Sequence, residues 1–224
     1  MQAARCAIAP GAFHLKGGHT HAFHPRRDHF AYFSAMAYPY VGLTAEVDVT
    51  PLTDYRARSG SPFFLTLLHC VARAANSVPQ LRQRIVDGEI WEFDVCLSSF
   101  IVAKDDETYA YCQVRTDLPL PEFLPYAEKR KNAARMDGNI EEGGDALPCF
   151  FISTLPWMSY TSLIQPAPAP ADSNPRITWG KAELRGDRVL LPLTLLCHHA
   201  LVDGLHISRF YAALDRELKQ LVLL

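Results

Sequence analysis

One short segment, CHHALVDG at residues 197–204, places two adjacent histidines and an aspartate where an apolar, strand-like run ends and an amphipathic helical pattern begins. Such junctions often present side chains into clefts. Successive side chains of an extended chain point to opposite faces, so at most one of His198 and His199 faces a given substrate. Asp203, four residues further on, could turn back towards it. The segment therefore predicts either a catalytic histidine or a hydrogen-bonded structural one.

In the structural interpretation, this segment serves to begin the helix that follows it. Asp203 is a good N-cap for the helix that follows, and Gly204 eases the turn before it. A metal site would need a third ligand at a plausible spacing, and the other histidines have neither metalloprotease nor zinc-finger spacing. Those histidines are His14, His19, His21, His24, His29, His69 and His206. We predict no functional metal, although the histidine-rich start of the chain could bind nickel or zinc adventitiously.

The composition excludes several classes of partner. The chain has 224 residues, 49% of them hydrophobic, which is ample for a buried core in one domain. With 22 Lys and Arg against 24 Asp and Glu, there is no basic excess for a nucleic acid or an anionic membrane. The chain has no apolar run of about 18 residues and no signal-peptide pattern, so we expect a cytoplasmic protein. Its six scattered cysteines predict reduced, buried thiols.

Residues 1–23 lack a periodic apolar face and are interpreted as an amino-terminal extension, and residues 24–224 as one domain. Within it, Ser61 is the expected cap of a long helix, and the Asp87-Gly88 pair predicts a tight hairpin turn. The expected elements, in order, are a short helix after Pro25, a strand at 41–50, a helix at 61–78, a hairpin at 84–91, strands at 95–103 and 108–114, a helix at 120–142, strands at 149–153 and 158–163, a proline-rich loop at 165–175, a long hairpin at 176–197 and a helix at 205–222.

The segment HHALVDG resembles the HHxxxDG signature of the CoA-dependent acyltransferases, the superfamily of chloramphenicol acetyltransferases, dihydrolipoyl acyltransferase cores and condensation domains. The resemblance to the chloramphenicol acetyltransferases extends over residues 24–220 in the family's order. It is carried by HPRRDHF at 24–30, FISTLPWMSYTS at 151–162, ITWGK at 177–181 and GDRVLLPL at 186–193. The chain is identified as a member of that family.

The resemblance implies an α+β fold, a two-layer sandwich with a mixed β-sheet covered by helices. The element order, with strands and helices mixed along the chain, agrees with that class. A stand-alone unit of this size is similar to the trimeric members, whose active sites lie between neighbouring subunits. We therefore expect a homotrimer with three shared sites.

The resemblance also assigns catalytic roles for acyl transfer from a CoA thioester to a hydroxyl. His199 matches the general base that takes the proton of the acceptor hydroxyl. Ser153 matches the serine that donates to the oxyanion of the tetrahedral intermediate. Thr178 corresponds to a threonine that holds a water against the transition state, although a strand threonine with no such role is an alternative. His198 is expected to face away from the site.

Two further residues match a structural pair of the family. Asp203 and Arg26 correspond to a buried ion pair that fixes the catalytic loop without touching the substrate. Loss of one partner would leave an uncompensated charge. Activity would then fall because the loop is misplaced.

Residues expected to bind substrates are assigned less directly. In the family, the acceptor pocket is walled by apolar and aromatic side chains on and after the first helix, which gives Tyr32 and Phe33, with Val102 from a strand. Val102, like Ala37 and Pro39 nearby, is smaller than the residue usual in that wall. Trp157 and Tyr160, close in sequence to the expected oxyanion serine, are candidates for the channel that admits the pantetheine arm of CoA; core packing is the alternative.

The function implied is that of an acetyl-CoA-dependent O-acetyltransferase, with chloramphenicol as the leading acceptor and acetyl-CoA as the donor. The alternative is an acyltransferase of the same type that uses another hydroxylated small molecule or another acyl-CoA. Two other classes are a non-catalytic trimer that binds small molecules and a metal-binding protein built on the histidine-rich start.

Overall fold

The computed structural model describes residues 18–20, 26–138, 140 and 145–224. The helices are α1 (Arg27–Ser34), α2 (Thr50–Ser59), α3 (Phe63–Asn76), α4 (Leu120–Asp137) and α5 (Gly204–Gln220), with short 3₁₀ turns η1 (Pro79–Arg82) and η2 (Leu221–Leu223). The strands are β1 (Gly18–Thr20), β2 (Tyr40–Asp48), β3 (Gln83–Val86), β4 (Glu89–Phe93), β5 (Leu97–Ala103), β6 (Tyr109–Val114), β7 (Cys149–Leu155), β8 (Arg176–Gly180), β9 (Glu183–Arg185) and β10 (Arg188–His198).

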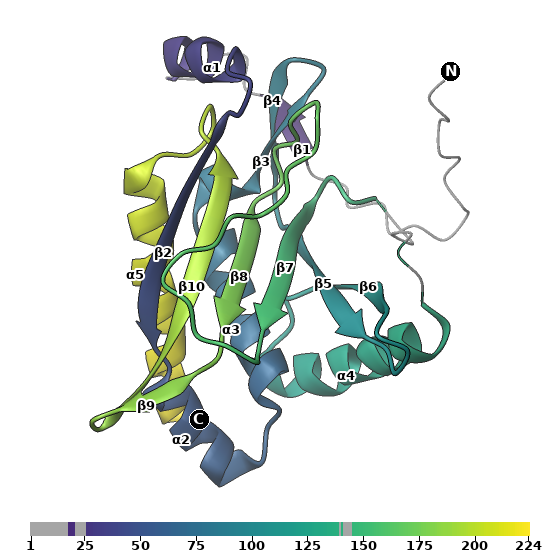
Figure 1. Ribbon diagram of the computed structural model, residues 1–224, viewed down its shortest axis with the longest axis vertical. Helices are drawn as coiled ribbons and strands as arrows, with labels where there is room; N and C mark the ends of the chain where they lie inside the picture. Colours follow the sequence, from purple (N-terminus) through teal and green to yellow (C-terminus); the bar gives the residue numbers. More distant parts are fainter. Residues whose placement is uncertain (1–17, 21–25, 139, 141–144) are drawn as a thin grey trace.

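The main sheet is mixed and carries the strands in the order β2-β10-β8-β7-β5-β6, with β9 also paired to β10 (Figure 1). Strand β7 runs parallel to β5 and to β8, and the other pairs in this sheet are antiparallel. A second, three-stranded sheet has the order β1-β4-β3. Strand β1 lies within the expected extension and pairs with β4; residues 1–17 and 21–23 of that extension lie outside the described residues.

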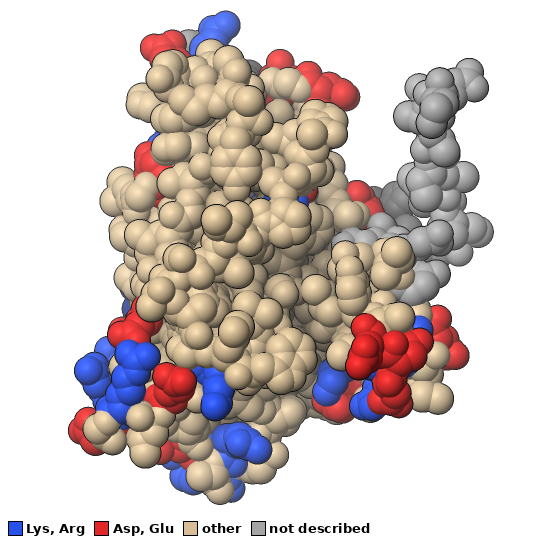
Figure 2. Space-filling model, viewed as in Figure 1, with Lys and Arg blue, Asp and Glu red and all other residues tan. Residues whose placement is uncertain are grey.

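Helices α3 and α5 lie behind the main sheet, and α4 packs beside β6 (Figure 1). The opposite face is crossed by the segment between β7 and β8, residues 156–175. Figure 2 shows that this face is largely free of charged side chains, which gather mainly at its rims. The fold is therefore the expected α+β sandwich, with helices on one side and a loop on the other.

Several sequence predictions are confirmed by this architecture. The hairpin of β3 and β4 turns at Asp87 and Gly88, whose φ angles of 51° and 81° are the positive values that such a turn needs. The apolar helix is α3, and the closing helix is α5, which begins directly after Asp203. The five described cysteines are free and buried.

Other predictions are wrong. The strand expected at 158–163 does not form; β7 ends at Leu155 and an irregular loop follows. Ser61 does not cap α3, because the N-cap is Pro62 and no side chain caps it. The long hairpin expected at 176–197 does form, but its first strand is interrupted: β9 pairs with β10 next to the turn, and β8 pairs with it further along.

Helix α2 was missed by the sequence analysis. Leu52 is its one buried residue, so it lacks the apolar stripe by which a helix is recognised. Its signals are Pro51 near its start and Gly60 at its C-cap, where φ is 71°.

A buried arginine joins the two sheets. The Arg84 side chain, on β3, is fully inaccessible to solvent. Its guanidinium donates to four backbone carbonyls, those of Leu81, Gln83, Leu147 and Cys149, at 2.7–2.9 Å, and approaches Cys96 Sγ at 3.5 Å. These partners are neutral, so the positive charge of Arg84 is stabilised by carbonyl dipoles. The same hydrogen bonds hold β3 against the start of β7.

We expect Arg84→Met to lower the free energy of unfolding by about 3 kcal/mol or more, because several buried carbonyls lose their donors at once. Denaturant unfolding of the variant and of wild type measures the difference. Arg188→Met, at an exposed arginine, is the matched control and should change it little. Equal stability of both variants would contradict this account.

Candidate active site

The histidine segment forms a compact turn at the end of β10. The backbone N–H of His199 donates to the carbonyl of Pro39 at 2.7 Å, which joins the turn to the start of β2. The backbone N–H groups of Leu201 and Val202 both donate to the carbonyl of His198, at 3.0 and 3.1 Å. The position of His199 is therefore fixed by backbone hydrogen bonds on both sides.

The side chain of His199 has a defined tautomer. Its Nδ1 lies 2.9 Å from the carbonyl oxygen of Val202. A carbonyl oxygen only accepts, so Nδ1 carries a hydrogen, and in the neutral ring the lone pair is on Nε2. This is the arrangement that a general base needs, with its basic nitrogen directed away from the turn.

Aromatic side chains surround the two histidines. Phe33 of α1 stacks on the His199 ring, with centroids 3.8 Å apart and planes inclined by 23°. Tyr32 meets Phe33 edge-on but is itself 66% exposed. The ring of His198 is buried near Tyr40, and its Nδ1 accepts from the backbone of Ala200, so it faces away from its neighbour as expected.

Arg26 and Asp203 form the expected ion pair. Asp203 is also the N-cap of α5: its Oδ1 accepts from the backbone N–H of Leu205 at 3.0 Å, and the His206 ring accepts from the backbone of Asp203 at 3.1 Å. Partial burial alone would raise the pKa of the Asp203 carboxyl, but the hydrogen bond from Arg26 and the nearby positive charges lower it. Both interpretations of Asp203, as cap and as ion-pair partner, therefore hold together.

Hydroxyl side chains form a row across the main sheet. Ser153 on β7 is in register with Thr178 on β8, Thr178 with Thr194 on β10, and Thr194 with Thr44 on β2. Residues paired across strands share a face of the sheet, so these four hydroxyls lie on one side. The Thr44 and Thr194 hydroxyls are 2.7 Å apart.

The loop after β7 packs on this hydroxyl row. The Tyr160 hydroxyl donates to the Thr178 carbonyl at 2.8 Å and accepts from the Thr194 hydroxyl at 3.2 Å. Gly180 permits the close approach, because a Cβ there would lie 2.8–3.0 Å from Pro192, the Met158 carbonyl and the Tyr160 ring. Tyr160 therefore supports the hydroxyl row and does not line the cavity described next.

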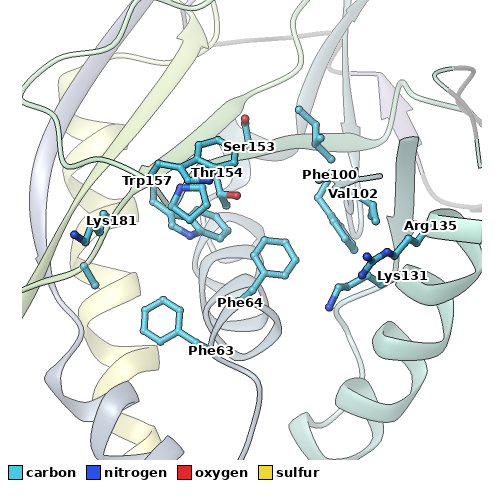
Figure 3. A pocket seen from close by; sticks show the side chains of 16 residues that line it. Phe63, Phe64, Phe100, Val102, Lys131, Arg135, Ser153, Thr154, Trp157 and Lys181 are labelled. Atoms are coloured by element: carbon cyan, nitrogen blue, oxygen red, sulfur yellow. The ribbon is translucent and has the colours of Figure 1, made fainter. Parts of the chain in front are cut away.

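A cavity of about 440 Å³ opens beside Ser153 (Figure 3). Strands β5 and β7 are paired only as far as Phe100 and Ile152, and the cavity lies beyond that point, flanked by α3 and α4. Its lining residues are Phe63, Phe64, Phe100, Ile101, Val102, Ala103, Lys131, Arg135, Ser153, Thr154, Pro156, Trp157, Trp179, Gly180, Lys181 and Ala182. Val102, Ser153 and Trp157 were predicted as site residues, and the structure brings them together here.

The cavity also contains residues that the sequence analysis missed. Lys131 and Arg135 reach it from α4, and Lys181 lies on the opposite side (Figure 3). Lysines and arginines are frequent on any helix surface, and only the fold shows that these three meet at one cavity. No carboxylate is among the residues that line it.

The structure does not bring His199 and Ser153 together within one chain. Ser153 is level with Thr194, and His199 follows five residues later along β10, so they are separated by roughly 16 Å along the strand direction. Phe33 and Arg26 lie at the His199 end, while Val102 and Trp157 lie at the Ser153 end. Each chain therefore carries two separate halves of the predicted site.

Within the described part of the chain, no group of three or more His, Cys, Asp or Glu side chains is placed to hold a metal ion. Most of the histidine-rich start lies outside the described residues. Among the described helices, none has the length and apolar character needed to cross a membrane.

Comparison with known proteins identifies the family. The family model described as chloramphenicol acetyltransferase matches residues 21–215. Chloramphenicol acetyltransferase 2 of Escherichia coli is 30% identical over 198 residues, which cover 85% of this chain and 91% of the relative. Chloramphenicol acetyltransferase 3 of the same species is 29% identical over 191 residues, which cover 83% of this chain and 88% of the relative.

Solved structures agree with the sequence comparison. A chloramphenicol acetyltransferase superposes with a TM-score of 0.79 at 25% identity, covering 88% of this chain and 96% of that one. The dihydrolipoamide acetyltransferase of Azotobacter vinelandii shares the fold, with a TM-score of 0.65 at 19% identity over 86% and 87% of the two chains. The chain is thus an acyltransferase and belongs to the chloramphenicol acetyltransferase family.

Proposed function

We propose that the protein transfers the acetyl group of acetyl-CoA to a hydroxyl of chloramphenicol. The observation that carries the proposal is the tautomer of His199, whose Nδ1 is held by the Val202 carbonyl so that Nε2 is free to accept a proton. Within this family fold, a base of that kind and a serine at an aromatic cavity fit acyl transfer to an alcohol.

The chemistry is a direct transfer. The acceptor oxygen attacks the thioester carbonyl carbon while His199 Nε2 takes its proton. The tetrahedral intermediate then collapses, the carbon–sulfur bond breaks, and the proton passes from the imidazolium to the leaving sulfur. The products are the acetyl ester and free CoA.

Ser153 and Thr178 act on the intermediate in this proposal. The Ser153 hydroxyl donates to the oxyanion, an effect worth roughly 3 kcal/mol for one preplaced donor. Thr178, in register beside it and almost fully buried, holds a water against the same centre. Arg26 and Asp203 act from outside, because they fix the turn that carries His199.

A second copy of the chain completes each site in the proposed homotrimer. His199 of one subunit meets the Ser153 half of its neighbour, since one chain holds Ser153 level with the middle of β10 and His199 beyond its end. The sheet face that is largely free of charged side chains in Figure 2 is suited to such a contact. Exposed aromatic side chains near His199, among them Tyr32 and Tyr38, are suited to it as well.

The cavity beside Ser153 is the proposed channel for the acyl donor. Its aromatic walls, including Trp157 and Phe64, suit the pantetheine arm. The three basic side chains at its sides, Lys131, Arg135 and Lys181, suit the phosphates of CoA. No metal takes part in the proposed reaction.

Acetyl-CoA-dependent thiol release with purified protein and chloramphenicol tests the function. We expect release that depends on chloramphenicol and is lost in His199→Ala. Release with other hydroxylated acceptors only would move the function to a different substrate, and release from longer acyl-CoA thioesters only would change the donor. Saturable CoA binding without any release would identify a non-catalytic binding protein.

Mixed assemblies test the shared site. His199→Ala and Ser153→Ala are each expected to lower kcat by at least a hundredfold. Co-expression of equal amounts of the two chains should restore about a quarter of wild-type activity, because about one interface in four then pairs an intact histidine with an intact serine. A mixture no more active than its components would contradict sites built between subunits.

The ion pair of Arg26 and Asp203 gives a pH-dependent prediction. The pKa of Asp203 is lowered in the folded protein, so the pair stabilises the fold above the carboxyl's unfolded pKa. This stabilisation is lost as pH falls through the lower, folded pKa. Asp203→Asn retains a capping side chain and removes the charge. Its melting temperature should lie below wild type at neutral pH and converge with it as pH falls through the lowered pKa of Asp203, whereas a constant gap would contradict the assignment.

The basic side chains on α4 give a prediction for the donor. Lys131→Gln and Arg135→Gln should each raise the KM for acetyl-CoA about fivefold and leave the KM for S-acetylpantetheine, which lacks the nucleotide, unchanged. Lys129→Gln, on the same helix but outside the cavity, is the control. An equal effect on both donors would place the phosphates elsewhere.

A further inference from the structure

The side-chain amide of Gln165 lies at the hydroxyl row, although Gln165 is neither in the motifs that carry the family resemblance nor among the predicted site residues. Gln165 belongs to the loop that crosses the face of the sheet, and its Oε1 accepts from the Thr178 hydroxyl at 3.3 Å. Thr178 is itself paired in register with Ser153. The amide therefore lies within about two strand spacings, roughly 10 Å, of the oxyanion serine.

The nitrogen of this amide, Nε2, has no hydrogen-bond partner within the described residues. It is also buried from solvent. A buried donor without an acceptor is costly, and such groups are uncommon in folded proteins. The Tyr160 and Thr194 hydroxyls bond to each other and to the Thr178 carbonyl, and neither forms a hydrogen bond with Nε2.

We propose that Gln165 is a specificity-determining residue whose Nε2–H binds an oxygen of the acceptor substrate next to the reacting hydroxyl. One end of the amide orients the Thr178 hydroxyl, and the other end recognises the acceptor. The preferred acceptors are therefore hydroxyl compounds that carry a second oxygen, as a hydroxyl, carbonyl or nitro group, close to the reacting one. Acceptors with only hydrocarbon around the hydroxyl leave the donor unpaired and bind less well.

This inference rests on the proposed acetyl transfer, because it assigns the acceptor to the hydroxyl row. It is independent of the donor channel, which lies between β5 and β7 and is not lined by Gln165. Changes at Gln165 should consequently act on the acceptor and spare acetyl-CoA.

Two substitutions separate recognition of the acceptor from orientation of Thr178. Gln165→Met keeps the size and removes both polar atoms, while Gln165→Glu keeps an oxygen for Thr178 and removes the donor. We expect both variants to lower kcat/KM for chloramphenicol about tenfold, mainly through KM, and to leave the KM for acetyl-CoA within twofold. Val222→Ala, at a 55% exposed residue outside this loop, is the control and should match wild type.

The outcomes are distinct. A Gln165→Glu variant with wild-type kinetics would show that the amide only orients Thr178 and would overturn the inference, as would unchanged kinetics in Gln165→Met. A parallel loss of acetyl-CoA affinity or of melting temperature would show a general structural effect and would also overturn it. If wild type releases no thiol with chloramphenicol, the proposed function fails and this inference fails with it. If wild type turns over normally and the Gln165 variants have the same kinetics, only the inference fails.

Discussion

The length and register of β10 are the constraint on which the rest of the site depends. This strand of 11 residues pairs with β2 on one side and with β8 on the other, so the positions of its residues relative to both neighbours are fixed. Its middle is level with Ser153, and its end leads into the turn of His199. Because a strand is nearly inextensible, no local rearrangement brings these two side chains together. In the proposed assembly, folding prepares the two halves and association joins them.

The two halves are held by different means. At the histidine end, a turn of few residues is fixed by hydrogen bonds to the carbonyls of Pro39 and Val202 and by the ion pair of Arg26 with Asp203. At the serine end, strand pairing sets Ser153 and Thr178 side by side, and Tyr160 and Gln165 of the loop after β7 form hydrogen bonds with Thr178. A change in the turn after β10 therefore affects the first half, and a change in the loop after β7 affects the second, which also requires that the sheet forms.

The sequence predicts most of the fold because its signals are local and strong. The apolar stripe of α3, the Asp87-Gly88 turn and the cap at Asp203 each depend on residues close together in the chain. The helix at Thr50–Ser59 could not be found in this way because it buries almost nothing, and the false strand at 158–163 alternates in polarity although its residues form a loop held by Gly180 and Tyr160.

The site was predictable only in part. His199, Ser153 and Arg26 follow from motifs that the family shares. Lys131 and Gln165 do not, because their relevance arises where β5 separates from β7 and where a loop folds back on the sheet. Both arrangements depend on tertiary contacts, which produce no periodic pattern and no motif spacing that could be recognised in the sequence.

The partners of Arg84 bear on how the molecule responds to acid. Its guanidinium is held by backbone carbonyls, which do not titrate, so the bond between the two sheets keeps its strength as protons accumulate. The turn that carries His199 depends instead on the carboxylate of Asp203, which acid neutralises. Because the pKa of Asp203 is lowered, only strong acid would loosen the turn that carries His199, and it would leave the carbonyl contacts of Arg84 unchanged.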